Sequence, residues 1–515
     1  MDAFDTISWN LVSPPDIAIY QLYLVGKGSS HISSLTWISG ETRDYNLQRI
    51  SCWFEAIRHL YLRRYGETKA AVGTKVALNR PVDPLLDHCK KQLALLWEST
   101  PFDTNSVDRA LVLATLLNAA ATLSDGDSVV LYGGKLLALL QKMKIEEKDW
   151  KLLRPVWEIV CNVSQRPLAH VINLRRRHDR WEFMVHQAMK EQFLMIRGVG
   201  DLSGAQPMDH TSLSKDAYAF DGEWPTSKLL EYVGTRAHLT KLVRKDWLPL
   251  DLAPFDRDAP KVEKSVPMHP SEVACALSHI ATWKTCNRVL TIDVLQPSTE
   301  QSSTGRSGLV RQPDTIRQAW HIAGYARGPP LRWQNGGLPP TPVCLVLEDD
   351  AHVEHGFCEK LDALLAELPR DFHYCALGYG RPKSAPIFRP WPSRPCIGIP
   401  SHLFFATGYL VSFSGLEYLK EHSPVQGPID AWLGLLQTKN FDNLTGQRLG
   451  VGSHGKGGGI TSNQVAKLMD FMAYCAVPML CQQPLGKHAQ NATPGRGRRW
   501  KEKDTDITYS GHKNV

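Results

Sequence analysis

The sequence lacks long apolar runs. No stretch reaches about 18 consecutive apolar residues, the length at which a membrane-spanning helix is indicated, so no transmembrane segment is predicted. The first residues, MDAFDTISWNLVSPPD, carry acids and prolines where a signal peptide has a basic start and an apolar core. We therefore expect a cytoplasmic location, and a secretory lumen only if further residues precede this N-terminus.

Paired cysteines and a large excess of one charge are also missing. The 11 cysteines are odd in number and include no CxxC pair, which argues against a disulfide framework and against a zinc ribbon. The formal net charge is only +7 over 515 residues. Such a balance allows an anionic ligand but does not indicate a nucleic-acid-binding protein.

The chain divides into two regions that differ in the spacing of their apolar residues. Residues 1 to about 165 are rich in apolar segments with mostly helical spacing: 106–123, 128–145 and 148–163. Asp125–Gly126–Asp127 breaks the pattern between the first two. We predict an α-rich accessory region over 1–165, with a structural or partner-binding role and no catalytic constellation. The alternating strand and helix patterns that follow predict an α/β domain over 166–515.

Four segments define the expected elements of the α/β domain. They are a strand, basic turn and helix over 169–184, a helix over 269–284, a strand over 372–380, and a strand, turn and helix over 402–422. Ser271 stands where a helix N-cap is expected. Residues 294–341 are rich in Ser, Gly and Pro, and we predict a flexible insertion there; residues 490–515 are basic and predict a flexible tail.

One apolar run ends in three carboxylates. Val343–Leu347 is followed directly by Glu348, Asp349 and Asp350, although adjacent carboxylates repel one another and resist burial. A strand that ends in this way puts them at the C-terminal edge of the sheet, where ligands bind in open α/β proteins. Their oxygens suit a hard divalent cation, which would offset the repulsion. The alternative is a solvated strand end that enters a turn, and this segment alone does not decide between the two.

Six segments, taken in order, resemble glycosyltransferase family 25, which includes lipopolysaccharide-type galactosyltransferases and collagen hydroxylysine galactosyltransferases. They are VINLRRRHDRWEFM (171–184), AFDG (219–222), HPSEVACALSHIATWK (269–284), LVLEDDA (345–351), FFATGYLVSFSGLEYL (404–419) and GPIDAWL (427–433). TDI at 505–507 is similar to the terminal motif of the family. The resemblance covers residues 166–510, about two thirds of the chain. Each motif is weak alone, and the shared order carries the argument.

The resemblance implies a GT-A fold, a nucleotide-sugar-binding α/β domain with a central, mainly parallel sheet. It implies an inverting hexosyltransferase that uses a UDP-sugar, with galactose favoured, and a divalent metal, with Mn²⁺ favoured. The acceptor would be a hydroxyl of a glycan, a lipid-linked glycan or hydroxylysine. Neither nucleic acid nor a membrane span is expected, and the oligomeric state is left open.

The resemblance also implies roles for single residues. Asp350 would bind the metal, Glu348 and Asp349 would assist through ribose or water, and Asp430 would be the catalytic base, since an inverting transfer must take the proton of the acceptor hydroxyl. The remaining residues expected to bind the donor are Asn173, Arg180, Asp221, Gly222, Ser278 and His279. Asn173 and Arg180 flank the first turn, where an amide and a guanidinium suit a nucleotide and its phosphates.

A structural role stays open for each of these side chains. The basic turn before Arg180 is also what a solvated surface turn looks like, and Asp221 can belong to an ordinary Asp–Gly turn. His279 can be satisfied at a helix–sheet contact, and Ser278 can bond back to its own helix. Asp430 can be the N-cap of the helix that follows it.

The sequence differs from the family pattern in two respects, and it also contains a near-match to an unrelated motif. The 294–341 insertion lengthens the link between two motifs, and Ser271 and Leu416 replace the glycine and the alanine of the family pattern. GVGSHGKGGG (450–459) approaches a phosphate-binding P-loop but has Gly457 where Ser or Thr must hold magnesium. The competing hypothesis is a protein of the same fold that binds without catalysing, and the intact EDD and Asp430 argue against it.

Overall fold

The computed structural model describes part of the chain in detail. The described residues are 106–143, 153, 156, 159–160, 162–163, 166–198, 219–249, 252, 267–294, 343–369, 371–380, 387–388, 393–445 and 471–483. The chain divides into two compact units, and each is described by itself. The first comprises Met1–Leu168, His178–Ile196 and Glu300–Gly324, and the second comprises Ala169–Arg177, Arg197–Thr299 and Tyr325–Val515.

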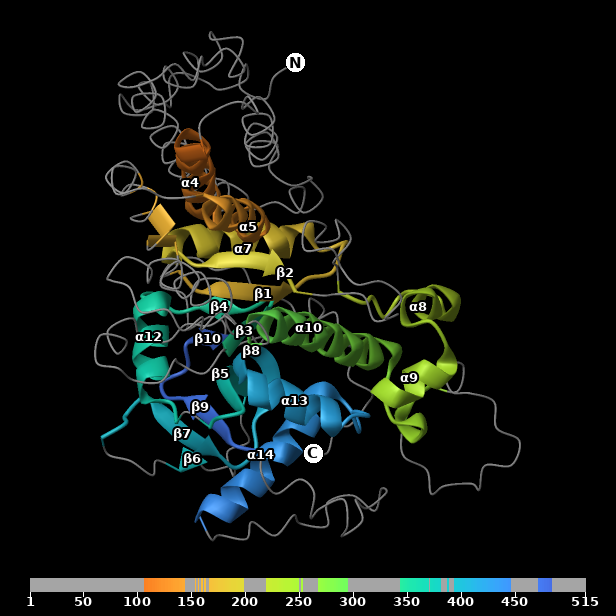
Figure 1. The fold of residues 1–515 in the computed structure, drawn as a ribbon. Coiled ribbons are helices and arrows are strands. Elements are labelled where there is room, and N and C mark those ends of the chain that lie inside the picture. The colour runs from red at the N-terminus through yellow and green to blue at the C-terminus, as the bar shows by residue number, and fades with distance from the viewer. Residues whose placement is uncertain are drawn as a thin grey trace, which may run out of the picture. The chain divides into compact units, whose positions relative to one another are not determined.

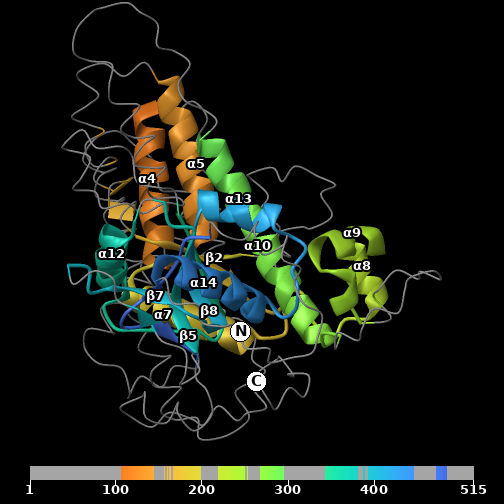
Figure 2. The ribbon, with the colours of Figure 1, turned by 90° about the horizontal axis from the view of Figure 1, so that it is seen from below.

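Two long helices of the first unit, α4 (Ser106–Thr122) and α5 (Gly126–Lys142), pack side by side (Figures 1 and 2). Alanine and leucine fill the buried face of α4, where small side chains let the helices approach closely. Between them, Asp125 is the N-cap of α5, and its carboxylate accepts hydrogen bonds from the Ser128 N–H (3.4 Å) and hydroxyl (2.7 Å). The structure thus confirms the first two predicted helices and the break between them.

The first unit also holds α7 (His178–Glu191) and β2 (Leu194–Arg197, with Arg197 counted in the second unit). Trp181, Met184 and Ala188 recur at helical spacing on the buried face of α7. β2 lies directly against the start of α5, and the absence of a side chain at Gly126 permits this close approach. A Cβ there would be 2.6 Å from the Met195 carbonyl oxygen.

The second unit carries the remaining elements. They are β1 (Leu168–Ile172, with Leu168 counted in the first unit), α8 (Thr226–Val233), α9 (Arg236–Leu242), the short helix η4 (Lys245–Trp247), α10 (Pro270–Val294), β3 (Val343–Glu348), β4 (His352–Val353), α12 (Phe357–Glu367), β5 (Tyr374–Gly380), β6 (Ile387–Phe388), β7 (Ile397–Pro400), β8 (Phe404–Ser412), α13 (Phe413–Glu421), α14 (Ile429–Thr445), β9 (Ala473–Ala476) and β10 (Cys481–Gln482). The elements predicted from the four patterned segments are confirmed as β1, α7, α10, β5, β8 and α13.

The main sheet of this unit is mixed. Its strands lie in the order β1-β3-β8-β5-β9-β7-β6. β1 pairs with β3, and β5 pairs with β9, in parallel, whereas β8 runs antiparallel to both of its neighbours, β3 and β5. The α/β class is therefore confirmed. The expected mainly parallel arrangement holds only in part, because the antiparallel β8 is inserted at the centre of the sheet.

Three helices, α10, α13 and α14, gather on the face of the sheet to which Tyr409 points (Figures 1 and 2). α10 contacts both other helices, and α14 also contacts β8. Trp283 of α10 and Trp432 of α14 meet with ring centroids 6.2 Å apart. Both tryptophans and Tyr409 are at most 5% exposed, so this aromatic contact forms the core of the second unit.

On the opposite face of the sheet, two neighbouring strands each have a glycine, so no side chains project there. Gly378 of β5 and Gly408 of β8 face Cys481 of β10, and a Cβ on either glycine would lie 2.6 Å from the Cys481 sulfur. β10 pairs antiparallel with β4, which follows β3 by a turn. The two glycines therefore let β10 lie directly against the sheet, next to the end of β3.

α10 begins earlier than the sequence suggested. Its first residue is Pro270, and the Glu272 carboxylate accepts a hydrogen bond from the His269 N–H at 2.7 Å. The expectation that Ser271 is the N-cap is therefore wrong. Proline is favoured at the first helical position and glutamate two residues later reaches back to the cap, so His269 takes the cap position.

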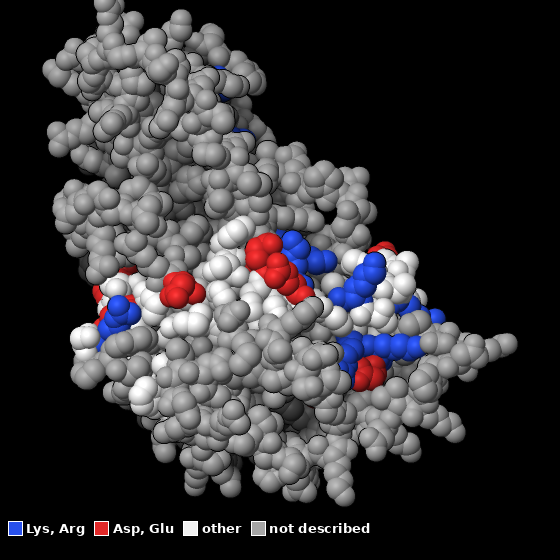
Figure 3. Space-filling model, turned by 60° about the horizontal axis from the view of Figure 1, so that its bottom comes forward, with Lys and Arg blue, Asp and Glu red and all other residues white. Residues whose placement is uncertain are grey.

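Some predicted segments lie outside the described residues. These are the insertion after Val294, the glycine loop at 450–459, the tail at 490–515 and the third apolar-rich segment except for a few positions. Of the helices that the structure describes, none combines the length and the apolar character that a membrane crossing requires. On the face shown in Figure 3, acidic side chains lie among the basic ones of the described residues, so no extended patch of one sign is visible there.

Candidate functional site

The three carboxylates lie where the sequence placed them, at the C-terminal end of β3. Residues 343–347 are buried, Glu348 is partly exposed, and Asp349 and Asp350 follow in a turn. β1 lies beside β3 with Ile172 opposite Glu348, and the Asp349 N–H donates to the Ile172 carbonyl oxygen at 3.1 Å. Both aspartates are nevertheless less than 10% exposed, so the reading as a freely solvated strand end does not describe them.

Asn173 supports Asp349. It follows β1 directly, is 2% exposed, and donates through Nδ2 to Oδ2 of Asp349 at 2.7 Å and to the Arg177 carbonyl oxygen at 3.1 Å. A hydrogen bond from an amide reduces the cost of burying a carboxylate. The structure thus brings Asn173 to the predicted site, where its amide hydrogens bond to protein groups.

Gln483 supports Asp350, which the sequence did not suggest. Its Nε2 donates to Oδ2 of Asp350 at 2.9 Å. Gln483 follows β10, which is positioned by its pairing with β4 and by the contact of Cys481 with the two glycines. The only local signals for this arrangement are Gly378 and Gly408, each inside a strand pattern.

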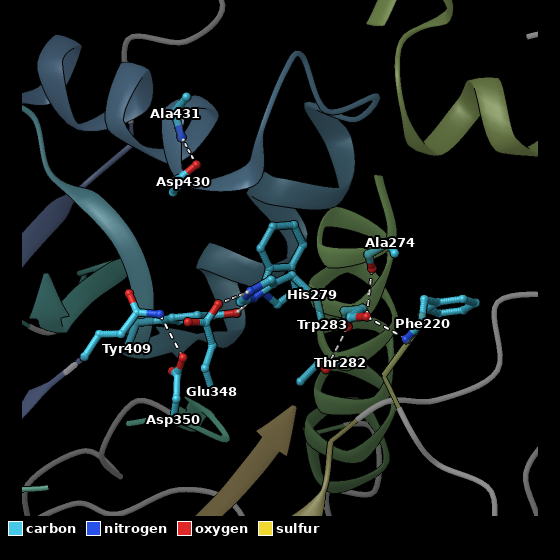
Figure 4. A network of polar contacts seen from close by, with 12 residues as sticks. Phe220, Ala274, His279, Thr282, Trp283, Glu348, Asp350, Tyr409, Asp430 and Ala431 are labelled. Atoms are coloured by element: carbon cyan, nitrogen blue, oxygen red, sulfur yellow. Dashed lines mark hydrogen bonds and ion pairs between the residues drawn. The ribbon is translucent and has the colours of Figure 1, made fainter. Parts of the chain in front are cut away.

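Glu348 ends a chain of buried polar groups (Figure 4). Its Oε1 lies 3.3 Å from His279 Nε2, His279 Nδ1 lies 2.9 Å from the Tyr409 hydroxyl, and Trp283 Nε1 donates to that hydroxyl at 2.8 Å. His279 and Tyr409 are fully buried. Strands β3 and β8 and helix α10 each contribute to this chain.

The proton positions in the chain follow from its donors. Burial raises the pKa of Tyr409 well above its ordinary value, so the side chain remains a hydroxyl. Since that oxygen accepts from Trp283, its own hydrogen points to His279 Nδ1. With Nδ1 as the acceptor, the ring hydrogen lies on Nε2 and points to Glu348. His279 is thus the satisfied histidine of a helix–sheet contact and also fixes the orientation of Glu348.

Asp430 shares a neighbourhood with these carboxylates. Burial raises the pKa of the Cys275 thiol well above its ordinary value, and four carboxylates raise it further: Glu348, Asp430, Asp350 and Glu272. Groups from the end of β3, from α14 and from α10 therefore act on one sulfur. Figure 4 includes Asp430 of α14 in the same close-up view as Glu348 and Asp350.

Asp430 is not the N-cap of its helix. α14 begins one residue earlier, at Ile429, and Oδ1 of Asp430 accepts from the Ala431 N–H at 2.8 Å. A carboxylate in the first turn still interacts favourably with the helix dipole. The stabilising role and the expected role as a base remain compatible, because Asp430 is only partly buried.

His402 lies beside α14 and was not anticipated. Its Nδ1 is 3.2 Å from the Thr438 hydroxyl, and a Cβ on Gly434 would lie 2.6 Å from its ring. Burial lowers the pKa of His402, while the Gly434 carbonyl group and Asp430 raise it. The imidazole is therefore neutral near pH 7 and lies within electrostatic reach of Asp430.

The turn that holds Asp221 and Gly222 is anchored to α10. The Phe220 N–H donates to the Ser278 hydroxyl at 2.9 Å, and this hydroxyl donates to the Ala274 carbonyl oxygen at 2.8 Å. A Cβ on Gly222 would be 2.5 Å from the Ser271 Cα. Ser278 thus bonds to its own helix, as the structural alternative held, and also fixes this turn.

Asp221 carries the polar contacts of the turn. It accepts from Arg176 Nε at 2.8 Å and from the Glu223 N–H at 3.0 Å. Arg176 belongs to the basic turn after β1. Arg180 lies in α7, in the first unit, is buried there, and is not one of the residues that the second unit assembles.

Two groups of side chains in the described part of the chain could hold a metal ion. One is Cys275, His279 and Glu348, whose ligand atoms lie within 4.8 Å of one another. The other is His170, Cys286 and Cys344, at the same mutual distance and fully buried. In the first group Glu348 offers a carboxylate oxygen, His279 a ring nitrogen and Cys275 a sulfur, while Asp350 belongs to neither group.

The fold and the site define an α/β protein with buried, supported carboxylates at the C-terminal end of a central strand. No protein-family model, no curated protein and no solved structure matches the chain. The resemblance to glycosyltransferase family 25 therefore stays a prediction from the ordered motifs.

Proposed function

We propose that this protein is a metal-dependent, inverting glycosyltransferase of the GT-A type. It would move a hexose, with galactose favoured, from a UDP-sugar to a hydroxyl of a glycan, a lipid-linked glycan or hydroxylysine. One observation supports the proposal most: Asp349 and Asp350 are buried yet held by Asn173 and Gln483 at the edge of the sheet. The protein maintains a costly cluster of carboxylates where α/β proteins bind ligands.

Carboxylate oxygens are the donors that a divalent cation such as Mn²⁺ prefers. Asp350 would hold it, assisted by Glu348, whose orientation His279 fixes. Asp349 is held by Asn173 and would act through ribose or water. When bound, the ion would neutralise the diphosphate of the donor and stabilise it as a leaving group.

Asp430 supplies the base in this scheme. The acceptor oxygen forms a bond to the anomeric carbon from the face opposite the diphosphate, the bond between that carbon and the phosphate oxygen breaks, and UDP leaves. The acceptor hydroxyl gives its proton to the Asp430 carboxylate. The carboxylate lies in the first turn of α14, and α14 packs against β8, the neighbour of β3 in the sheet.

The nucleotide side of the site would be formed by the turns after β1 and before α8. Asp221 and Gly222 lie on a turn that Ser278 and Asn173 fix through backbone contacts. Asp221 can accept hydrogen bonds from ribose or base, in competition with Arg176. The role of Arg180 in phosphate binding stays a prediction.

A thermal-shift assay tests the binding step. UDP with Mn²⁺ should raise the melting temperature, because a ligand that binds only the folded state stabilises it, by about 2.7 kcal/mol at a concentration of 100 times Kd. UDP without metal should give a smaller shift. If no nucleoside diphosphate with Mn²⁺ or Mg²⁺ shifts the transition, the proposal is wrong.

A donor screen tests the chemical step. UDP-galactose, UDP-glucose and UDP-N-acetylglucosamine are each incubated with Mn²⁺ and acceptor, and released UDP is measured. Asp430→Asn should abolish transfer while UDP and Mn²⁺ still shift the melting temperature, whereas Asp350→Asn should abolish both. Glu421→Gln, an exposed carboxylate at the end of α13, is the matched control and should change neither. Binding without transfer by the wild type, with every donor and acceptor class, would favour the non-catalytic alternative.

A further inference from the structure

A second cluster of metal-ligand side chains lies deep in the core, apart from the carboxylates. It consists of His170 of β1, Cys344 of β3 and Cys286 of α10, and each residue is at most 1% exposed. Their ligand atoms all lie within 4.8 Å of one another. The transferase scheme uses none of the three.

The fold brings the three side chains together through strand register and helix spacing. β1 and β3 are parallel, with His170 opposite Val346. Cys344 lies two residues before Val346 and therefore points to the same face of the sheet as His170. α10 covers that face, and a Cβ on Gly198 would contact both His170 and Thr282 of α10, at 3.1 and 3.2 Å.

We propose that His170, Cys286 and Cys344 form a zinc site inside the core of the second unit. Two thiolates and one imidazole are a soft donor set, which selects zinc over magnesium, calcium or manganese. Zinc bonds of about 2.3 Å to sulfur and 2.0 Å to nitrogen place neighbouring ligand atoms roughly 3.4 to 3.8 Å apart. The three ligand atoms lie within 4.8 Å of one another, so binding would draw them together by at most about 1 Å. Zinc sites with three protein ligands take water as the fourth ligand.

The charge of the site favours zinc over monovalent copper. Two thiolates neutralise a divalent zinc ion, so the loaded site carries no net charge. A monovalent ion would leave one negative charge in the core, which is costly to bury. Binding of zinc would displace a proton from each thiol, because zinc binds the thiolate form.

The proposed ion would join three elements on which the carboxylate site depends. On α10, Cys286 follows His279 by seven residues, so both lie on the same side of the helix. On β3, Cys344 precedes Glu348 by four residues, so both point to the same face. A zinc ion bound by Cys286 and Cys344 would therefore hold together α10 and β3, the helix and the strand that carry His279 and Glu348.

The test measures zinc in the purified full-length chain, kept in a thiol-free reductant and dialysed without chelator. We expect about one zinc ion per chain by elemental analysis, and at least a tenfold loss in Cys286→Ala and in Cys344→Ala. Cys375→Ala is the matched control, because Cys375 is equally buried in the same sheet but lies outside both groups. It should keep the metal. Cys275→Ala should also keep it, which separates the two candidate groups.

A second measurement covers the case in which the core variants fail to fold. The zinc-free wild type is titrated with Co²⁺, and tetrahedral coordination by thiolates gives visible absorption bands together with sulfur-to-metal charge transfer. The proposal is wrong if the wild type contains no zinc and neither Zn²⁺ nor Co²⁺ binds. It is also wrong if zinc is lost in Cys275→Ala but retained in Cys344→Ala. Zinc binding with no transferase activity would leave this proposal intact and refute only the one above.

Discussion

The hydroxyl of Tyr409 bridges two buried groups, and its removal tests the polar chain behind Glu348. It accepts from Trp283 Nε1 at 2.8 Å and contacts His279 Nδ1 at 2.9 Å. Tyr409→Phe removes this one oxygen and keeps the ring. Each polar group left without its buried partner costs about 1–3 kcal/mol, so the variant should lose about 2–6 kcal/mol of stability. A domain is typically stable by about 5–15 kcal/mol, so the variant should still fold.

Tyr379→Phe is the matched control for this change. The Tyr379 hydroxyl donates to the Ala476 carbonyl oxygen at 3.0 Å from a partly buried position, and its removal should cost about 1 kcal/mol. Hydrogen exchange followed by mass spectrometry, over peptides of β3, β8 and α10, measures the local opening free energy. A loss of about 2 kcal/mol lowers protection roughly thirtyfold.

Two results would refute the argument. If Tyr409→Phe lowers protection no more than Tyr379→Phe does, the buried hydroxyl does not bridge the two groups as described. The tautomer of His279 gives the second readout, because nitrogen chemical shifts distinguish the ring hydrogen on Nε2 from that on Nδ1. We expect Nε2–H in the wild type; Nδ1–H there would contradict the proton positions assigned to the chain.

Three further changes have defined outcomes. Gly408→Ala puts a Cβ 2.6 Å from the sulfur of Cys481, so we expect a loss of about 1–3 kcal/mol in denaturant unfolding and increased exchange in β10; unchanged exchange would contradict the close contact. Because the pKa of His402 is lowered below its ordinary value of 6.5, the unfolded state binds the proton more readily, and stability should fall as the pH drops below about 6.5. His402→Gln should weaken this dependence in melting experiments, and an unchanged pH profile would refute it. Asp125→Ala removes the N-cap that binds Ser128 and should cost about 1 kcal/mol in the first unit, whereas Asp127→Ala should cost less.

The local parts of the fold could be predicted from the sequence, because their causes are local. The apolar run before Glu348 is a buried strand, and the patterns over 169–184 and 402–422 became β1 with α7 and β8 with α13. Even the error at Ser271 is local, since Pro270 and Glu272 both indicate an earlier helix start.

The order of the strands could not be predicted, because it depends on contacts between distant segments. Nothing in the pattern of 404–412 shows that β8 is antiparallel and lies between β3 and β5. The partners of the carboxylates are non-local for the same reason. Asn173 was expected near the site, but only the fold shows that its amide binds Asp349.

The contact between Gln483 and Asp350 determines when the carboxylate site can be completed during synthesis. The two residues are 133 positions apart in the chain. When the ribosome has completed β3, the segment that lies on Gly378 and Gly408 has not yet been made. In the nascent chain Asp350 therefore lacks the Gln483 hydrogen bond, which can form only when residues 471–483 have left the exit tunnel. A chain that is released before that point would carry the acidic residues of the site without the strand and the amide that hold Asp350 in place.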